Sequence, residues 1–242
     1  MWAATGARIV RRPLASLWDA TSERTRVLSV SHVASATGAI HPVADLCARA
    51  RAEGIVSVVD GAHGPGHVPV DLAAIGADAY SGNCHKWLCA PKGSGFLWVR
   101  EELQQRIEPL VVSWGWPNKA FASRHGWQGT RDPAAWLAVP AAIGFQREWK
   151  WDAVRARCHA LAERFLELSG LEPAARPFAQ MVGAVLPPCK PEEVQRRLRE
   201  EHRIEVPCFE RNGRPLLRLS VQGYNDEEDI ERLLAALTKI LD

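Results

Sequence analysis

Short runs rich in β-branched residues alternate with amphipathic stretches along the first half of the chain, and this alternation constrains the fold more than any other feature. The runs 26–31 (RVLSVS) and 54–60 (GIVSVVD) predict buried strands, and the stretch 42–53 between them predicts a helix with proline in its first turn. Shorter strands are expected at 78–82 and 94–99. Strands that alternate with helices form a mostly parallel sheet covered on both faces. The sequence therefore predicts an α/β fold.

The pattern changes in the last part of the chain. Two strands and two helices are predicted there, at 181–186, 216–220, 191–203 and 226–241. This succession is typical of a small α+β domain. We therefore predict two domains, an α/β domain over residues 1–150 and a small α+β domain over residues 151–242.

The segment that joins the two patterns has its own character. Residues 108–131 hold proline, glycine and tryptophan at few periodic positions, which predicts a long ordered loop. The pair Asp132-Pro133 predicts the start of a helix that runs to about residue 149 and is kinked at Pro140. A second amphipathic helix is predicted over 152–169.

Charge and hydrophobicity exclude several classes of protein. Thirty Lys and Arg residues face 28 Asp and Glu residues, a net charge of +2 that is too balanced to predict nucleic-acid binding. No apolar run approaches the ~18 residues that span a bilayer, and the N-terminus lacks a signal-peptide pattern. The six cysteines form no C-x-x-C pair, which favours reduced thiols. We therefore expect a cytoplasmic protein without nucleic-acid or membrane partners.

Asp60, His63 and Lys86 are the candidate chemical groups of the first half. Asp60 ends a predicted strand, where parallel sheets bind ligands, although it can also be a turn residue. His63 alone favours a structural role. Lys86 precedes an apolar run, where burial would lower the pKa of its amine; a surface lysine is the alternative. A lysine for a Schiff base and a carboxylate for a pyridinium nitrogen are what pyridoxal phosphate requires.

Long ordered motifs carry a family resemblance. They are SHVASATGAIHPVADL, VVDGAHGPGHVPVDL and GADAYSGNCHKWLCAPKGSGFLWV within 30–99, GWQGTRDPAAWLAVPAAIGF at 126–145 and RLSVQGYNDEEDIERLL at 218–234. With these motifs the chain resembles the class V aminotransferase family of pyridoxal-phosphate enzymes, in particular its isopenicillin-N-epimerase-like branch. The resemblance implies the large domain of the pyridoxal-phosphate-dependent transferases followed by a small α+β domain, an amino-acid substrate and a homodimer.

The resemblance also implies roles for the three candidates. Lys86 is similar to the family lysine that forms the Schiff base with the cofactor. Asp60 is similar to the partner of the pyridine nitrogen, and His63 to the residue beside the phenolic oxygen of the cofactor.

Five further residues match the family motifs. Asn83 and His85 fall where family members hold the phosphate, and Gly129-Thr130 resembles the segment that reaches the phosphate in the opposite subunit. Arg218 resembles the residue that binds the substrate α-carboxylate, a task that suits a planar guanidinium.

The start of the chain departs from the family pattern. Family members begin with an arm and several elements that include the first phosphate-binding turn, whereas residues 6–13 (GARIVRRP) already resemble a strand well inside the large domain. We therefore expect an N-terminally truncated chain, an unpaired sheet edge and an incomplete phosphate cradle, with activity reduced accordingly.

Several interpretations are open at this point. Epimerisation, transamination and elimination are all compatible with the motifs, and the amino acid is not defined. A non-catalytic remnant or binding subunit is a second interpretation. Cysteine desulfurase ranks lower, because Cys208 follows Pro207 in an arrangement unlike that of desulfurases and Cys84 favours a small buried thiol.

A metal hydrolase is the third class considered. It would use Asp60, His63, His67 and His85 as ligands. The run GPG at 64–66 disfavours a helix between His63 and His67, so their spacing does not present both rings on one helix face. We therefore predict no metal site.

Overall fold

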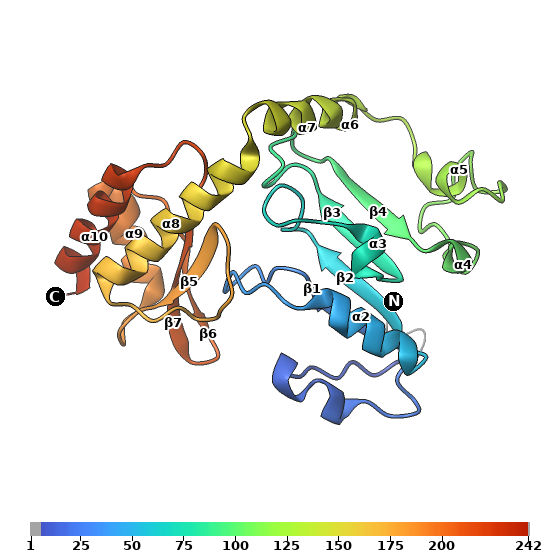
Figure 1. Cartoon of the computed structure of the whole chain (residues 1–242), viewed down its shortest axis with the longest axis horizontal. Coiled ribbons are helices and arrows are strands. Elements are labelled where there is room, and N and C mark those ends of the chain that lie inside the picture. The colour runs from blue at the N-terminus through green and yellow to red at the C-terminus, as the bar shows by residue number, and fades with distance from the viewer. Residues whose placement is uncertain (1–5, 242) are drawn as a thin grey trace.

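A computed structural model describes residues 6–241 and contains two separate sheets (Figure 1). The strands of the first sheet lie in the order β1 (Val27–Ser31), β2 (Val56–Gly61), β3 (Ala79–Asn83) and β4 (Gly95–Val99). The first three strands are parallel, as predicted, and β4 runs antiparallel to β3. A parallel neighbour needs a long crossover, and residues 84–94 contain no helix that could provide one.

Two helices cover one face of this sheet, α2 (Val43–Ala52) and α3 (Leu72–Ile75). Val43 and Cys47 of α2 pack against Val59 and Tyr80 in one buried cluster. Asp71 caps α3, because its carboxylate accepts hydrogen bonds from two free backbone N–H groups in the first turn of the helix.

The opposite face of the sheet differs from the prediction of cover on both sides. The strand register places Val27, Val58 and Leu97 on this face, and they are 52%, 37% and 49% exposed. Within residues 6–241, therefore, this face is not fully covered. Residues 6–13 form no strand, so the strand expected there is a wrong prediction, and Ile9 is 52% exposed.

Short helices precede and follow the first sheet. They are η1 (Leu14–Ser16), η2 (Trp18–Ala20), α4 (Glu101–Gln104), α5 (Phe121–Gly126), α6 (Ala134–Leu137) and α7 (Val139–Glu148). Residues 108–131 form the predicted loop, interrupted by α5. The helix predicted to kink at Pro140 is instead broken between α6 and α7, with this proline in the first turn of α7. Proline fits a first turn because it has no N–H to donate there.

In the last part of the chain, three helices pack against the second sheet. Its elements are α8 (Trp151–Ser169), β5 (Met181–Val185), α9 (Pro191–His202), β6 (Cys208–Arg211), β7 (Arg214–Ser220) and α10 (Glu227–Leu241). The strands are antiparallel in the order β5-β7-β6. α8 begins at Trp151, and the division into domains 1–150 and 151–242 stays a prediction.

The β6–β7 hairpin was missed by the sequence analysis. Asn212 and Gly213 connect the two strands with φ angles of +52° and +74°. An Asn-Gly pair tolerates positive φ at both positions and is the strongest short signal for such a turn. The sequence therefore contained the information for this strand.

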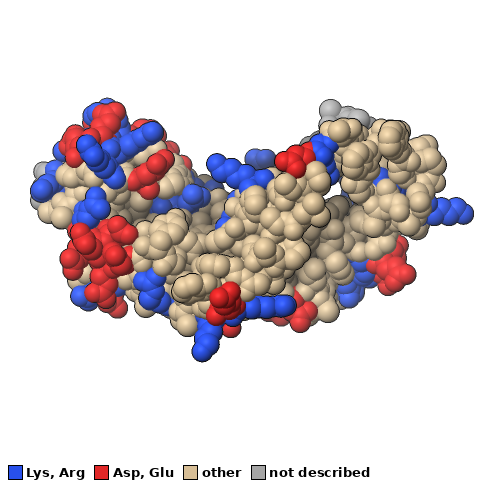
Figure 2. All heavy atoms as spheres, turned by 90° about the horizontal axis from the view of Figure 1, so that it is seen from above, with Lys and Arg blue, Asp and Glu red and all other residues tan. Residues whose placement is uncertain are grey.

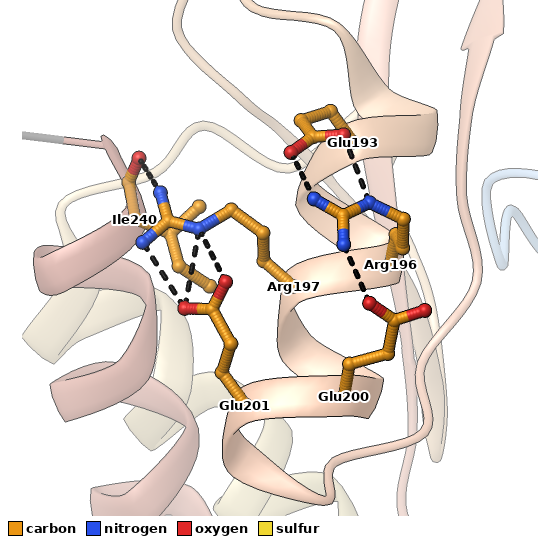
Figure 3. A network of polar contacts seen from close by, with 6 residues as sticks. All are labelled: Glu193, Arg196, Arg197, Glu200, Glu201 and Ile240. Carbon is orange, nitrogen blue, oxygen red and sulfur yellow. Dashed lines mark hydrogen bonds and ion pairs between the residues drawn. The ribbon is translucent and has the colours of Figure 1, made fainter.

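Charged side chains gather over the C-terminal elements, at the left of Figure 2, whereas the centre of that view is largely uncharged. Figure 3 shows the α9 surface, where Arg196 contacts Glu193 and Glu200. Arg197 also donates a hydrogen bond to the backbone carbonyl of Ile240, which ties α9 to α10. No helix in the described part of the chain has both the length and the apolar character to cross a bilayer.

Candidate functional site

Asp60 lies near the carboxyl end of β2, and Lys86 follows the end of β3 by three residues. Because β1, β2 and β3 are parallel, their carboxyl ends share one edge of the sheet, the usual place for a ligand. The Asp60 carboxylate is exposed and accepts a hydrogen bond of 3.0 Å from the Ala62 N–H. A turn and a second carboxylate oxygen without a hydrogen-bond partner among residues 6–241 are therefore combined at this strand end.

The amine of Lys86 contacts His63, which in turn contacts Trp87. Lys86 Nζ lies 3.1 Å from His63 Nε2, and Trp87 Nε1–H donates to His63 Nδ1 over 3.1 Å. Both ring nitrogens of His63 are thus engaged by side chains of the loop that follows β3. His63 is not an isolated structural histidine but the link between the lysine and the indole.

The local environment disfavours positive charge on both groups. Burial lowers the pKa of Lys86, Arg218 lowers it further, and the negative charge of Asp60 opposes this shift. Burial also lowers the pKa of His63 to about 4, with contributions from Lys86 and Arg218. His63 is therefore neutral at pH 7. The lowered pKa of Lys86 is in the direction expected for a buried lysine, one of the two interpretations of the sequence.

His67 supports the same loop. It is 1% exposed, and its ring stacks on Trp87 with centroids 4.1 Å apart and an angle of 10° between the planes. Its Nε2 accepts the Gln180 backbone N–H and its Nδ1–H donates to the His63 carbonyl, each over 3.1 Å. Both ring nitrogens of His67 are therefore engaged by the backbone, and burial lowers the pKa of His67 to about 3, so the ring is neutral.

Sequence reasoning considered His67 only as a candidate metal ligand and assigned Trp87 no role in the site. The usable signal was the glycine at position 66, whose φ of +79° a side chain rarely adopts. A Cβ on Gly66 would lie 2.4 Å from the Trp87 carbonyl oxygen. The glycine therefore lets the two loops touch.

Arg218 reaches the site from the second sheet. One guanidinium nitrogen, Nη1, donates to the Ser35 carbonyl over 2.9 Å and to Ser35 Oγ over 3.2 Å. Its Nε–H is buried and finds no acceptor among residues 6–241. Burial lowers the pKa of Arg218. The structure thus brings Arg218 close enough to Lys86 and His63 to influence their titration, with one donor unused.

The predicted phosphate residues lie at two places. His85 Nδ1–H donates to the Ser94 carbonyl over 2.9 Å. Asn83 lines a hollow of about 380 Å³ that Gln128 and Arg131, the neighbours of the Gly129-Thr130 pair, also line. Lys86, Asp60 and His63 do not line this hollow. The segment around Gly129-Thr130 is therefore near Asn83 but not at the Lys86 amine.

The cysteines weighed for desulfurase chemistry are buried. Cys84 and Cys208 are each 5% exposed, and burial raises the pKa of Cys208 to about 12. Neither thiol is an accessible thiolate. Cys89, to which the sequence analysis gave no role, is exposed. Its Sγ accepts a hydrogen bond of 3.7 Å from Gln222 Nε2.

These residues fit pyridoxal phosphate. An amine with a lowered pKa, an exposed carboxylate at the neighbouring strand end and a buried guanidinium N–H without an acceptor among the described residues are complementary to an aldehyde, a pyridinium and a carboxylate. The family profile described as aminotransferase class-V matches residues 8–233. The chain belongs to the class V aminotransferase family. Enzymes of this family are pyridoxal-phosphate-dependent.

Curated relatives of this family member include enzymes of different activity. The chain is 40% identical to the isopenicillin N epimerase of Amycolatopsis lactamdurans, over 91% of this chain and 61% of that protein. It is 32% identical to putative L-cysteine desulfhydrase 1 of Oryza sativa subsp. japonica, over 92% and 53%. The chain thus spans between one half and two thirds of the length of these relatives.

Solved structures of the family have the same fold. A cysteine desulfurase of Thermococcus onnurineus superimposes with a TM-score of 0.76 at 24% identity, over 89% of this chain and 60% of that one. A cysteine desulfurase of Escherichia coli superimposes with a TM-score of 0.78 at 20% identity, over 94% and 62%. The predicted fold class is confirmed.

Proposed function

We propose that this chain binds pyridoxal phosphate through the Lys86 amine and acts at the Cα of an amino acid, by epimerisation, transamination or elimination. The observation that carries the proposal is the 3.1 Å contact between Lys86 Nζ and the neutral His63, beside the strand end that carries Asp60. An unprotonated amine is the form that attacks an aldehyde.

When bound, the cofactor supplies an electron-poor ring that weakens the bonds of the substrate Cα. The Asp60 carboxylate would hold the proton on its ring nitrogen, because a negative charge favours the protonated form. Asn83 and His85 would hold the phosphate. We further propose a homodimer in which Gly129 and Thr130 reach the phosphate of the partner subunit.

Arg218 would orient the substrate through its carboxylate. Ser35 fixes one nitrogen of the guanidinium, and the buried Nε–H is left to donate to an incoming anion. A planar guanidinium binds both carboxylate oxygens at once, so the substrate Cα is held in one orientation. The side chain of the substrate is not restricted by this contact.

Lys86 would also move the Cα proton once substrate has displaced its amine. A primary amine of lowered pKa is a suitable general base near neutral pH. Return of the proton to the opposite face of Cα would give epimerisation, loss of a β-substituent would give elimination, and transamination would require the cofactor to accept the amino group. The relatives include an epimerase and a putative desulfhydrase, which supports both the first and the second outcome.

Cofactor binding is tested by titrating the purified chain with pyridoxal phosphate and reducing it with borohydride. We expect a visible absorbance band that reduction removes, with the label on Lys86 in the peptide map. Lys86→Arg should abolish both, while Lys92→Arg, which changes an exposed lysine of the same loop, should keep them. A label spread over surface lysines, or retained in Lys86→Arg, would contradict the proposal.

Turnover is tested by exchange of the Cα hydrogen for deuterium in a panel of amino acids. Exchange is common to all three outcomes, and chiral analysis, keto-acid assay and sulfide release then separate them. Arg218→Lys should reduce exchange far more than it reduces cofactor binding. Cofactor binding without exchange of any amino acid would support a non-catalytic chain. Sulfide release with sulfur left on a protein cysteine would support a desulfurase.

A further inference from the structure

The indole of Trp87 restricts where the proton of His63 can sit. An indole nitrogen only donates hydrogen bonds, so Trp87 Nε1–H requires an acceptor at His63 Nδ1, 3.1 Å away. A neutral imidazole carries one N–H and one acceptor nitrogen. With Nδ1 as acceptor, the proton of neutral His63 is on Nε2.

The second nitrogen of His63 then restricts Lys86. Nε2–H is a donor, and it faces Lys86 Nζ over 3.1 Å. A protonated ammonium has no lone pair to accept it, whereas a neutral amine has one. The hydrogen bonds Trp87 to His63 and His63 to Lys86 are thus all satisfied only when Lys86 is unprotonated.

We propose that Trp87 is a positioning residue that fixes the tautomer of His63 and thereby holds the Lys86 amine in its neutral, nucleophilic form. This inference extends the proposed function of Lys86, and its relevance to catalysis rests on that function. The proton positions themselves are properties of this chain and exist without the cofactor.

A ring contact, a bond behind that ring and a bond to the backbone hold Trp87 in place. His67 stacks on it, and the backbone N–H of Gln180 fixes His67 from the side of the second sheet. Gln146 Nε2 donates to the Trp87 carbonyl over 2.8 Å and is itself buried. Trp87 is buried, with 8% of the residue exposed. The donor is therefore held to one acceptor by both halves of the chain.

Besides the contact with neutral His63, two charged groups shift the pKa of Lys86. Asp60 favours the ammonium form and Arg218 opposes it. Neither of them depends on the Trp87 N–H. Removal of this N–H alone should therefore leave their effects unchanged, while it frees Nδ1 to carry the proton and Nε2 to accept from an ammonium.

The first experiment observes the tautomer of His63 in the whole chain without cofactor. Nitrogen-15 NMR of histidine-labelled protein near pH 7 distinguishes a protonated from an unprotonated ring nitrogen, and His63→Gln assigns the signal. We expect the proton on Nε2. A proton on Nδ1, or a doubly protonated ring, would overturn the proposal even if Lys86 binds cofactor.

The second experiment compares Trp87→Phe with Trp136→Phe. The first substitution keeps an aromatic ring for the His67 stack but removes the N–H, and the control removes an indole N–H that donates to the Gly95 carbonyl over 3.2 Å. Reductive methylation of Lys86, followed by mass spectrometry against pH, reports its unprotonated fraction. We expect Trp87→Phe to raise the pKa of Lys86, so that labelling of Lys86 below that pKa becomes roughly tenfold slower.

The outcomes separate positioning from structural support. The control should leave the Lys86 profile unchanged, and the labelling of Lys92 should be the same in all three proteins. Circular dichroism checks that Trp87→Phe folds. An unchanged Lys86 profile in folded Trp87→Phe would overturn the proposal, and so would the Nε2–H tautomer persisting in that variant. If the variant does not fold, the wild-type tautomer remains decisive.

Discussion

The two sheets of this molecule are stabilised in different ways. Around β5-β7-β6, the three helices and three strands share one continuous cluster of buried apolar side chains. Around β1-β2-β3-β4, the buried side chains divide into several small clusters, and one sheet face exposes Val58 and Leu97. Asp60, His63 and Lys86 belong to the region around β1-β2-β3-β4, whereas Arg218 comes from β7 in the other region. The region with the continuous core thus holds the Arg218 guanidinium, while the other candidate groups lie at a strand edge of the region with the divided core.

The largest expected effect is the loss of unfolding free energy in acid, where the contact between the two regions is weakened. His67 joins them through Gln180, and burial lowers its pKa to about 3 from the ordinary 6.5. The unfolded chain binds this proton first, so the contribution of His67 is full above pH 6.5 and is lost as pH falls towards 3. The expected loss of unfolding free energy is on the order of 4 kcal/mol. Denaturant unfolding at several pH values measures it.

The acid effect needs a control because carboxylates titrate in part of the same range. His67→Gln removes the titrating ring and keeps a polar side chain, so the pH dependence of the difference from wild type isolates His67. A difference that stays constant between pH 6.5 and 3 would show that His67 does not couple the regions through its proton.

Deletion of one leucine side chain from each sheet should sharpen the contrast. Leu217 on β7 is 0% exposed, whereas Leu97 on β4 is 49% exposed. Leu217→Ala leaves a cavity in a packed core and should cost about 3 kcal/mol of unfolding free energy. Leu97→Ala should cost less than about 1 kcal/mol. Equal losses in urea unfolding would mean that the exposed face is buried in solution.

Loss of the α3 cap should have a smaller effect in the less consolidated region. The Asp71 carboxylate accepts from Ala73 and Ala74, each over 3.0 Å. Asp71→Ala leaves these donors to water and should cost about 1 kcal/mol, and Asp71→Asn should retain much of the cap. The thermal midpoint of each variant tests whether Asp71→Ala loses more stability than Asp71→Asn. An equal loss in the two variants would contradict the capping role.

The surface ion pairs of α9 should have the smallest effect. Arg196 is half exposed and bonds two glutamates on its own helix, so water and salt screen both contacts (Figure 3). Arg196→Gln should change stability less than Asp71→Ala does, and the difference should vanish in about 1 M salt. A large, salt-independent loss would place part of the C-terminal stability in this network rather than in the core.

Some differences between expectation and structure have identifiable causes. The β6–β7 hairpin carried an Asn-Gly signal that local reasoning could have used. The antiparallel β4 follows from the absence of a helix between residues 84 and 94, which the prediction of a mostly parallel sheet did not take into account. The strand expected at 6–13 was wrong because apolar residues alone do not form a strand without a neighbour to pair with.

The sequence by itself predicted a mostly parallel sheet, the position of Asp60 at a strand end and an apolar segment after Lys86, because each depends on neighbours along the chain. Only the tertiary structure decided what these groups touch. The bond from Gln180 to His67 joins residues 113 positions apart, and that from Arg218 to Ser35 spans 183. Hydrogen-bond direction needs both partners in place. Periodicity and composition describe one segment at a time, so they do not place groups that lie far apart in the sequence.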